Sequence, residues 1–112
     1  MRCGRITTRV KIALSYGMSP YVDAFDRLLE LIEDLRAKGI KTVVTVGVST
    51  NNCVAMTSME ACDLQYRVVV VSDGTGTDSD DMQTATLTML KRLWARVLTT
   101  DEVLTELQQG AH

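Results

Sequence analysis

At 112 residues the chain is long enough for one domain and too short for a second. Hydrophobic residues make up 46% of it and charged residues 23%, which excludes a disordered protein, because disordered chains lack the apolar residues that build a core. A net charge of −2 gives no broad positive field and argues against nucleic acid as a partner, and no apolar run reaches the roughly 20 residues of a membrane span.

The N-terminal part of the chain predicts one strand and one helix. Arg9–Ser15 is a short β-prone run, and the turn residues of 17–20 interrupt it. From Asp23 to Lys38, apolar residues recur at every third or fourth position, which predicts an amphipathic helix. Gly39 stands where a helix commonly ends.

Two further runs predict buried strands. Thr42–Val48 is rich in β-branched residues and lacks clean alternation, which is typical of a strand covered on both faces. Arg67–Ser72 contains four consecutive valines and predicts a second such strand. The segment Asp73–Gly76 has turn chemistry and is expected to end this strand.

Helices are predicted between and after these strands. Asn51 or Asn52 is expected to cap a buried helix that runs to about Gln65. A second helix, from about Ser79, is expected to bury Met82, Ala85, Met89, Leu90 and Leu93. After a short strand, Arg96–Thr99, the spacing of Thr99 and Glu102 predicts a capping box that starts a last helix to about Gln108.

Strand and helix thus alternate along the whole chain. This order predicts right-handed crossovers and a parallel sheet with helices on both faces, a three-layer α/β fold of the doubly wound class. No repeat or linker divides the chain, so residues 1–112 are expected to form a single domain.

Cys53 follows the strand that ends at Val48, in the turn that leads into the next helix. Open parallel sheets bind ligands at the carboxyl ends of their strands. The N–H groups and partial positive charge of a helix start favour thiolate over thiol and can donate to a developing oxyanion. The pattern predicts a nucleophile, although the position alone fits equally well a half-buried cysteine that acts as a small hydrophobe.

The remaining cysteines, histidine and carboxylates limit the kinds of catalytic site that Cys53 could belong to. The chain has 3 cysteines, and Cys3 and Cys62 lack the setting of Cys53; an odd count without a C-x-x-C pair predicts reduced thiols. A cytoplasmic protein is expected, because the sequence shows neither a membrane span nor the pattern of a signal peptide. The single histidine, His112, lies at the chain end, so neither a Cys–His dyad nor a zinc site is expected. A base for Cys53 must then be a carboxylate, and Asp73 is expected to form a turn rather than to serve as that base.

The segment Val43–Val54, with Thr57, Tyr66–Asp73 and Arg96–Leu104 after it, resembles the signature of isochorismatase-like cysteine hydrolases. The resemblance implies that Cys53 attacks an amide or related carbonyl. It also implies that the peptide bond before Ser49 is cis and that the backbone N–H groups of Ser49 and Cys53 form the oxyanion hole. Thr50 and Asn51 are expected either to contact the substrate or to cap the turn.

Upstream, the segment Gly17–Phe25 resembles the nicotinamidase branch, in which a catalytic lysine directly precedes such a segment; here Tyr16 holds that position. The resemblance places the general-base aspartate, and the aspartate and two histidines of the nicotinamidase metal site, in an N-terminal half that this sequence lacks. We therefore expect a partial domain with no cofactor site of its own, an unpaired apolar sheet edge and homo-oligomerisation.

Three hypotheses follow for the function. The first is a nicotinamidase-type hydrolase that cleaves a small carboxamide through a thioester at Cys53. The second is a catalytically inactive, truncated homologue that serves as an interaction module, which Tyr16 in the lysine position favours. The third is a redox-sensing thiol at Cys53, which needs no base. Neither nucleic acid nor a membrane is expected as a partner.

Overall fold

The computed structural model describes residue 33 and residues 35–109. The predicted strand Arg9–Ser15, most of the predicted helix Asp23–Lys38 and Tyr16 lie outside the described residues. In chain order the described elements are strand β1 (Thr42–Val48), the π-helical segment η1 (Thr50–Val54), helix α2 (Ala55–Asp63), strand β2 (Arg67–Gly76), helix α3 (Asp80–Leu93), strand β3 (Arg96–Leu98) and helix α4 (Thr100–Gln109).

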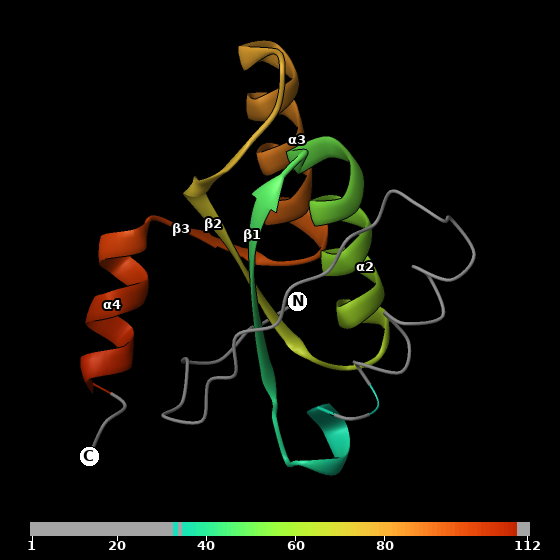
Figure 1. The fold of residues 1–112 in the computed structure, drawn as a ribbon, viewed down its shortest axis with the longest axis vertical. Helices are drawn as coiled ribbons and strands as arrows, with labels where there is room; N and C mark the ends of the chain where they lie inside the picture. Colours follow the sequence, from blue (N-terminus) through green and yellow to red (C-terminus); the bar gives the residue numbers. More distant parts are fainter. Residues whose placement is uncertain (1–32, 34, 110–112) are drawn as a thin grey trace.

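The described strands form one parallel sheet in the order β1-β2-β3. Helices α2 and α3 lie on one side of this sheet and α4 lies on the other (Figure 1). Each connection between neighbouring strands runs through a helix, as parallel strands require. The predicted three-layer α/β architecture is confirmed.

The core is centred on the four valines of β2, which alternate between the two faces. Val68 and Val70 pack in the cluster below α2 and α3, and Val69 and Val71 pack against Val103 of α4. Three of the four valines are fully buried and Val71 is only 4% exposed. An uninterrupted apolar run was therefore needed, because both faces of this strand are covered.

Two helices end on a residue in the left-handed conformation. Gly39 has a φ of 76°, and its N–H and that of Ile40 donate to carbonyls one turn back, each at 3.0 Å. This arrangement confirms the helix end predicted at Gly39. Gln65, with a φ of 74°, does the same after α2, whose last residue is Asp63 rather than the predicted Gln65.

The predicted end of the second strand is wrong. β2 does not stop at Ser72; it continues through Asp73–Gly76, the segment expected to form a turn. Glycine and aspartate favour turns only when the backbone has no other partner, and here the end of β1 supplies one.

A large bulge allows β2 to reach this second stretch of pairing. The pairing jumps from Thr45 opposite Val70 to Gly47 opposite Thr75, so four residues of β2 face a single residue of β1. Gly74 lies inside the bulge, where a Cβ atom would come within 3.1 Å of one valine side chain and 3.2 Å of another. A larger residue at this position would force these valine side chains to shift, so close packing favours glycine.

The buried face of α3 differs from the predicted one. Thr86 and Leu90 are its buried residues, whereas Met82, Met89 and Leu93 are 43%, 39% and 61% exposed. The predicted buried face was the one that carries the methionines. The observed buried face is rotated from it by about one residue position, which is roughly 100° around the helix axis. Only Leu90 of the expected large side chains is fully buried.

The predicted N-terminal ends of the last two helices, α3 and α4, are confirmed. The Ser79 hydroxyl accepts a hydrogen bond from the Met82 N–H at 3.3 Å. At α4, the Glu102 carboxylate accepts from the Thr99 N–H at 2.9 Å, and the Thr99 hydroxyl accepts from the Glu102 N–H at 3.2 Å. This reciprocal pair is the capping box that the spacing predicted.

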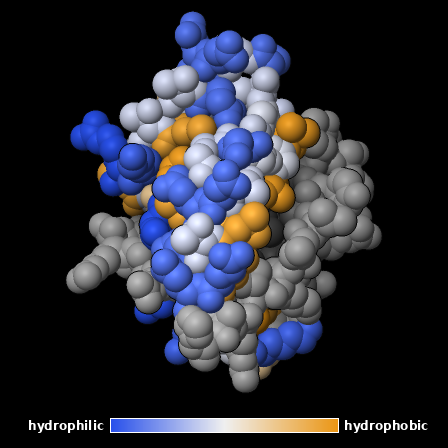
Figure 2. All heavy atoms as spheres, turned by 90° about the vertical axis from the view of Figure 1, so that its left-hand side faces the viewer, coloured by the Kyte–Doolittle hydropathy of each residue, from blue (hydrophilic) through white to orange (hydrophobic). Residues whose placement is uncertain are grey.

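The described surface is polar on the α4 side (Figure 2) and apolar along the edge strand β1. Across the described ranges, no helix combines the length and apolar character needed to cross a membrane. The α4 side is mainly hydrophilic, with small apolar patches between polar side chains (Figure 2). Within the described sheet β1 is an edge strand, and its Val46 and Val48 are 55% and 72% exposed.

Candidate active site

The predicted nucleophile lies at the carboxyl end of β1. Cys53 belongs to η1 and is half-buried, and its thiol donates a hydrogen bond to the Val48 carbonyl at 2.9 Å. The peptide bond between Val48 and Ser49 is cis, as the family resemblance implied. The thiol therefore faces the short loop by which the chain leaves the strand.

The loop is wound more widely than an α-helix. The Val54 N–H donates to the Ser49 carbonyl at 3.3 Å, and the Ala55 N–H points to the Thr50 carbonyl, both five residues back. Asn52 has φ and ψ of −126° and −106°, outside the helical range. The expected cap by Asn51 or Asn52 is wrong, because the helical segment begins after Ser49 without a side-chain cap.

The side chains of Thr50 and Asn51 have different surroundings. Thr50 is fully buried, and its hydroxyl has no hydrogen-bond partner in the part of the chain that the structure describes. Asn51 is exposed, and its side-chain oxygen accepts from the Thr77 hydroxyl at 2.8 Å. Contact of either residue with a substrate stays a prediction, as does the oxyanion hole of Ser49 and Cys53.

A buried polar pair fixes the helix after the nucleophile against the sheet. The hydroxyl oxygens of Thr45 in β1 and Ser58 in α2 are 2.9 Å apart, and Ser58 also donates to the Val54 carbonyl at 2.7 Å. Ser58 is completely buried, so each of these bonds offsets the desolvation of a polar group. The chain that follows Cys53 is thereby tied to β1.

Asp73 serves as a connection between β2 and α4. Its carboxylate accepts from the Thr100 hydroxyl and from the Thr100 N–H, each at 2.8 Å. The hydrogen bond from the Thr100 side chain lowers the pKa of the Asp73 carboxyl below its usual value. The hydrogen bond from the Thr100 backbone N–H lowers this pKa further. Asp73 thus caps α4 from a neighbouring strand. Among the described residues, no carboxylate is hydrogen-bonded to the Cys53 thiol, whose partner is the Val48 carbonyl.

The lowered pKa of Asp73 predicts a specific loss of stability in acid. A carboxyl whose pKa is lower in the folded state stabilises the fold above its unfolded pKa, and this contribution disappears as the pH falls through the folded pKa. We expect the thermal midpoint to fall between about pH 5 and pH 3, and to fall less steeply in Asp73→Asn. Asp101→Asn, also in the first turn of α4, is the control and should keep the wild-type slope; equal slopes in all three proteins would contradict the cap.

No metal site is present among the described residues. Nowhere in the described ranges do three His, Cys, Asp or Glu side chains come together. The donor set expected for a nicotinamidase-type metal therefore does not fit this part of the chain.

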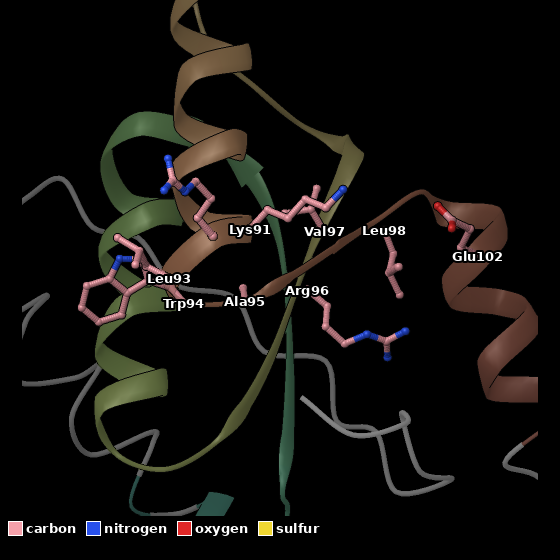
Figure 3. Close-up of a pocket in the computed structure, with 9 residues that line it drawn as sticks. Lys91, Leu93, Trp94, Ala95, Arg96, Val97, Leu98 and Glu102 are labelled. Carbon is pink, nitrogen blue, oxygen red and sulfur yellow. The ribbon is translucent and has the colours of Figure 1, made fainter. Parts of the chain in front are cut away.

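One cavity among the described residues is lined by residues distant in sequence from Cys53. It has a volume of about 370 Å³ and is bordered by the end of α3, by β3 and by Glu102 of α4. Leu93 and Trp94 lie at its α3 side and Glu102 at its α4 side (Figure 3). Arg96, another of its lining residues, is ion-paired with Glu106 at 2.8 Å, and none of the lining residues belongs to η1.

Fold and candidate site together define an α/β protein whose cysteine thiol lies at the carboxyl end of a parallel strand. The sequence matches the family described as the Isochorismatase domain over residues 22–102. The chain therefore belongs to the isochorismatase-like hydrolase family.

Several named proteins are similar to this chain in sequence or in structure. The uncharacterised isochorismatase family protein YwoC of Bacillus subtilis is 35% identical over 66% of this chain and 39% of its own length. Nicotinamidase 3 of Arabidopsis thaliana is 34% identical over 65% of this chain and 37% of its own. The structure of an isochorismatase family protein from Burkholderia thailandensis has a TM-score of 0.68 and 39% identity, over 70% of this chain and 42% of that one. The chain thus spans about two fifths of the proteins that it matches.

Proposed function

We propose that this protein takes part in the hydrolysis of a small carboxamide, in the manner of a nicotinamidase, with Cys53 as the nucleophile. The observation that carries the proposal is the half-buried Cys53 thiol at the carboxyl end of β1, in a chain of the isochorismatase-like family. The likeness to Nicotinamidase 3 supports the choice of a carboxamide.

The reaction would proceed in two displacements. The thiol of Cys53 loses its proton to a base, and the thiolate attacks the carboxamide carbon to form a C–S bond. The C–N bond then breaks, and the nitrogen takes up a proton and leaves as ammonia. Water next attacks the thioester, the C–S bond breaks, and a carboxylic acid and the free thiol are released.

The backbone near Cys53 would stabilise the charge of the tetrahedral intermediate. The N–H groups of Ser49 and Cys53 are the proposed donors to the oxyanion, which gains most where water is excluded. The family resemblance places the base outside the described residues, and Asp73 is not proposed for this role because its carboxylate is bound to Thr100. Thr50 and Asn51 are the residues proposed to contact the substrate.

Two products and one intermediate test the proposal. Incubation of the purified chain with nicotinamide is expected to release ammonia and nicotinic acid in equal amounts. Rapid acid quenching is expected to leave an acyl adduct on the peptide that contains Cys53, detectable by mass spectrometry. Ammonia release without a thioester, or an adduct at Cys62 instead, would contradict the assignment of the nucleophile.

A second function is an inactive homologue that acts as an interaction module. It is favoured by the absence, in the described residues, of a carboxylate hydrogen-bonded to the Cys53 thiol and by Tyr16 in the lysine position of the nicotinamidase branch. A folded chain that neither turns over nicotinamide nor forms an adduct would support this function over the first.

The proposal includes a homo-oligomer in the cytoplasm. The exposed Val46 and Val48 support self-association, because β1 is an edge strand of the described sheet and apolar edge strands are sites of pairing. The reduced cysteines expected from their odd number support a cytoplasmic location.

A further inference from the structure

Thr77 contacts the loop of the candidate nucleophile although it is distant in sequence. Its hydroxyl donates to the side-chain oxygen of Asn51, 26 residues earlier, at 2.8 Å. The carboxylate of Asp78 is a second acceptor at 3.2 Å, so the single hydroxyl proton has its closer partner in Asn51. Asn51 is two residues before Cys53 and belongs to the same π-helical segment.

The late part of β2 brings Thr77 to this position. Gly76, the last residue of the strand, pairs with Val48, which directly precedes the loop. Thr77 is the next residue along the chain and so reaches the level of the loop. Without the bulge, the register would place Asp73 opposite Val48, and Gly74 instead of Thr77 would come next along the chain.

Gln83 of α3 holds the bulge in place. Its side-chain amide nitrogen donates to the Thr75 hydroxyl at 3.2 Å, to the Thr75 carbonyl at 3.3 Å and to the Ser72 carbonyl at 3.5 Å. The contacts therefore join Ser72, inside the segment that has no partner in β1, to Thr75, the residue that directly follows this segment. The bulge, and with it the placement of Thr77, depends on α3.

We propose that Thr77 is a positioning residue for Cys53, acting through Asn51, and that Gln83 supports it by fixing the bulge of β2. The inference deepens the proposed function, because it concerns the same thiol. The loop between Val48 and Ala55 is held to β1 through Ser58 at its far end, and the Thr77 contact restrains its near end. Loss of that restraint would let the loop that carries Cys53 move relative to β1.

The rate of alkylation of Cys53 by iodoacetamide tests the inference without a substrate. Thr77→Val removes the hydroxyl but keeps the shape, and is expected to lower this rate at neutral pH by about three- to tenfold, the usual worth of one hydrogen bond. Thr77→Ser should restore it to within about twofold. Modification is quantified on the peptide that contains Cys53, which separates this thiol from Cys62.

Two further variants make the result specific. Thr88→Val removes a hydroxyl of α3 from a residue that is more exposed than Thr77; this hydroxyl donates to the Thr84 carbonyl at 2.8 Å, and its loss should leave the rate unchanged. Gln83→Met is expected to lower the rate in the same direction as Thr77→Val. Equal rates for Thr77→Val and Thr88→Val, or a faster reaction in Thr77→Val, would overturn the inference.

The outcome is separable from that of the proposed function. A chain that does not hydrolyse nicotinamide but whose Cys53 alkylation responds to Thr77 supports the positioning role and refutes the hydrolase. Hydrolysis that is unaffected by Thr77→Val, with unchanged alkylation, supports the hydrolase and refutes the positioning role. If both hold, the kcat should fall in Thr77→Val by the factor found for alkylation.

Discussion

Replacing Cys53 by alanine is expected to abolish ammonia release from nicotinamide, with a loss of at least about a thousandfold relative to the unchanged chain. The thiolate is the only protein group in the proposed reaction that forms a bond to the substrate carbon, and an alanine side chain offers no substitute. The fold should persist, because Cys53 is only half-buried and its one side-chain hydrogen bond goes to the carbonyl of Val48.

Cys62→Ala is the matched control for this experiment. Cys62 is another cysteine of the described chain, and it lies buried in α2 away from the strand ends. Its removal should lower the free energy of unfolding slightly and leave the turnover of the folded protein unchanged. Turnover that survives in Cys53→Ala, or that is lost only in Cys62→Ala, would rule out Cys53 as the nucleophile.

Local patterns were sufficient to predict most of the elements. β1 has the predicted bounds, Gly39 ends a helix, and the capping box of Thr99 and Glu102 starts α4. Each of these features depends on residues close together in the chain, so a single sequence contains the necessary information. The position of Cys53 at a strand end could be predicted for the same reason.

Long-range partners explain what the sequence analysis missed. Asp73–Gly76 has the composition of a turn, and only the end of β1, far away in the chain, makes it part of a strand. The pairings of Asn51 with Thr77 and of Gln83 with Thr75 join exposed or half-buried polar side chains that have no periodicity. No local signal marks them; a polar residue next to a predicted turn was the only available indication.

The rotation of α3 has a related cause. The methionines predicted a buried stripe, but the described sheet beneath the helix contacts the face of Thr86 and Leu90 instead. Hydrophobic periodicity reports which side chains are apolar, whereas the sheet decides which of them are covered. Met82, Met89 and Leu93 therefore remain exposed although they follow a helical spacing.

This difference between the two faces of α3 leads to a large expected effect on stability. Leu90 is fully buried in the cluster below α2 and α3, whereas Leu93, on the same helix, is 61% exposed. Leu90→Ala removes three buried carbon atoms and leaves a cavity, so we expect it to lower the free energy of unfolding by about 3 kcal/mol. Leu93→Ala, the matched control, should change it by less than about 1 kcal/mol, and urea unfolding measures both.

A loss of this size approaches the whole stability of a small domain, so a milder variant keeps the prediction testable. Leu90→Met nearly conserves the volume and should cost less than about 1.5 kcal/mol, which leaves a folded protein with a measurable transition. Similar losses for Leu90→Ala and Leu93→Ala would mean that α3 packs by the methionine face after all. Because α3 also carries Gln83, a weakened contact of Leu90 with the sheet should slow Cys53 alkylation as well, which links the packing of the core to the reactivity of the thiol.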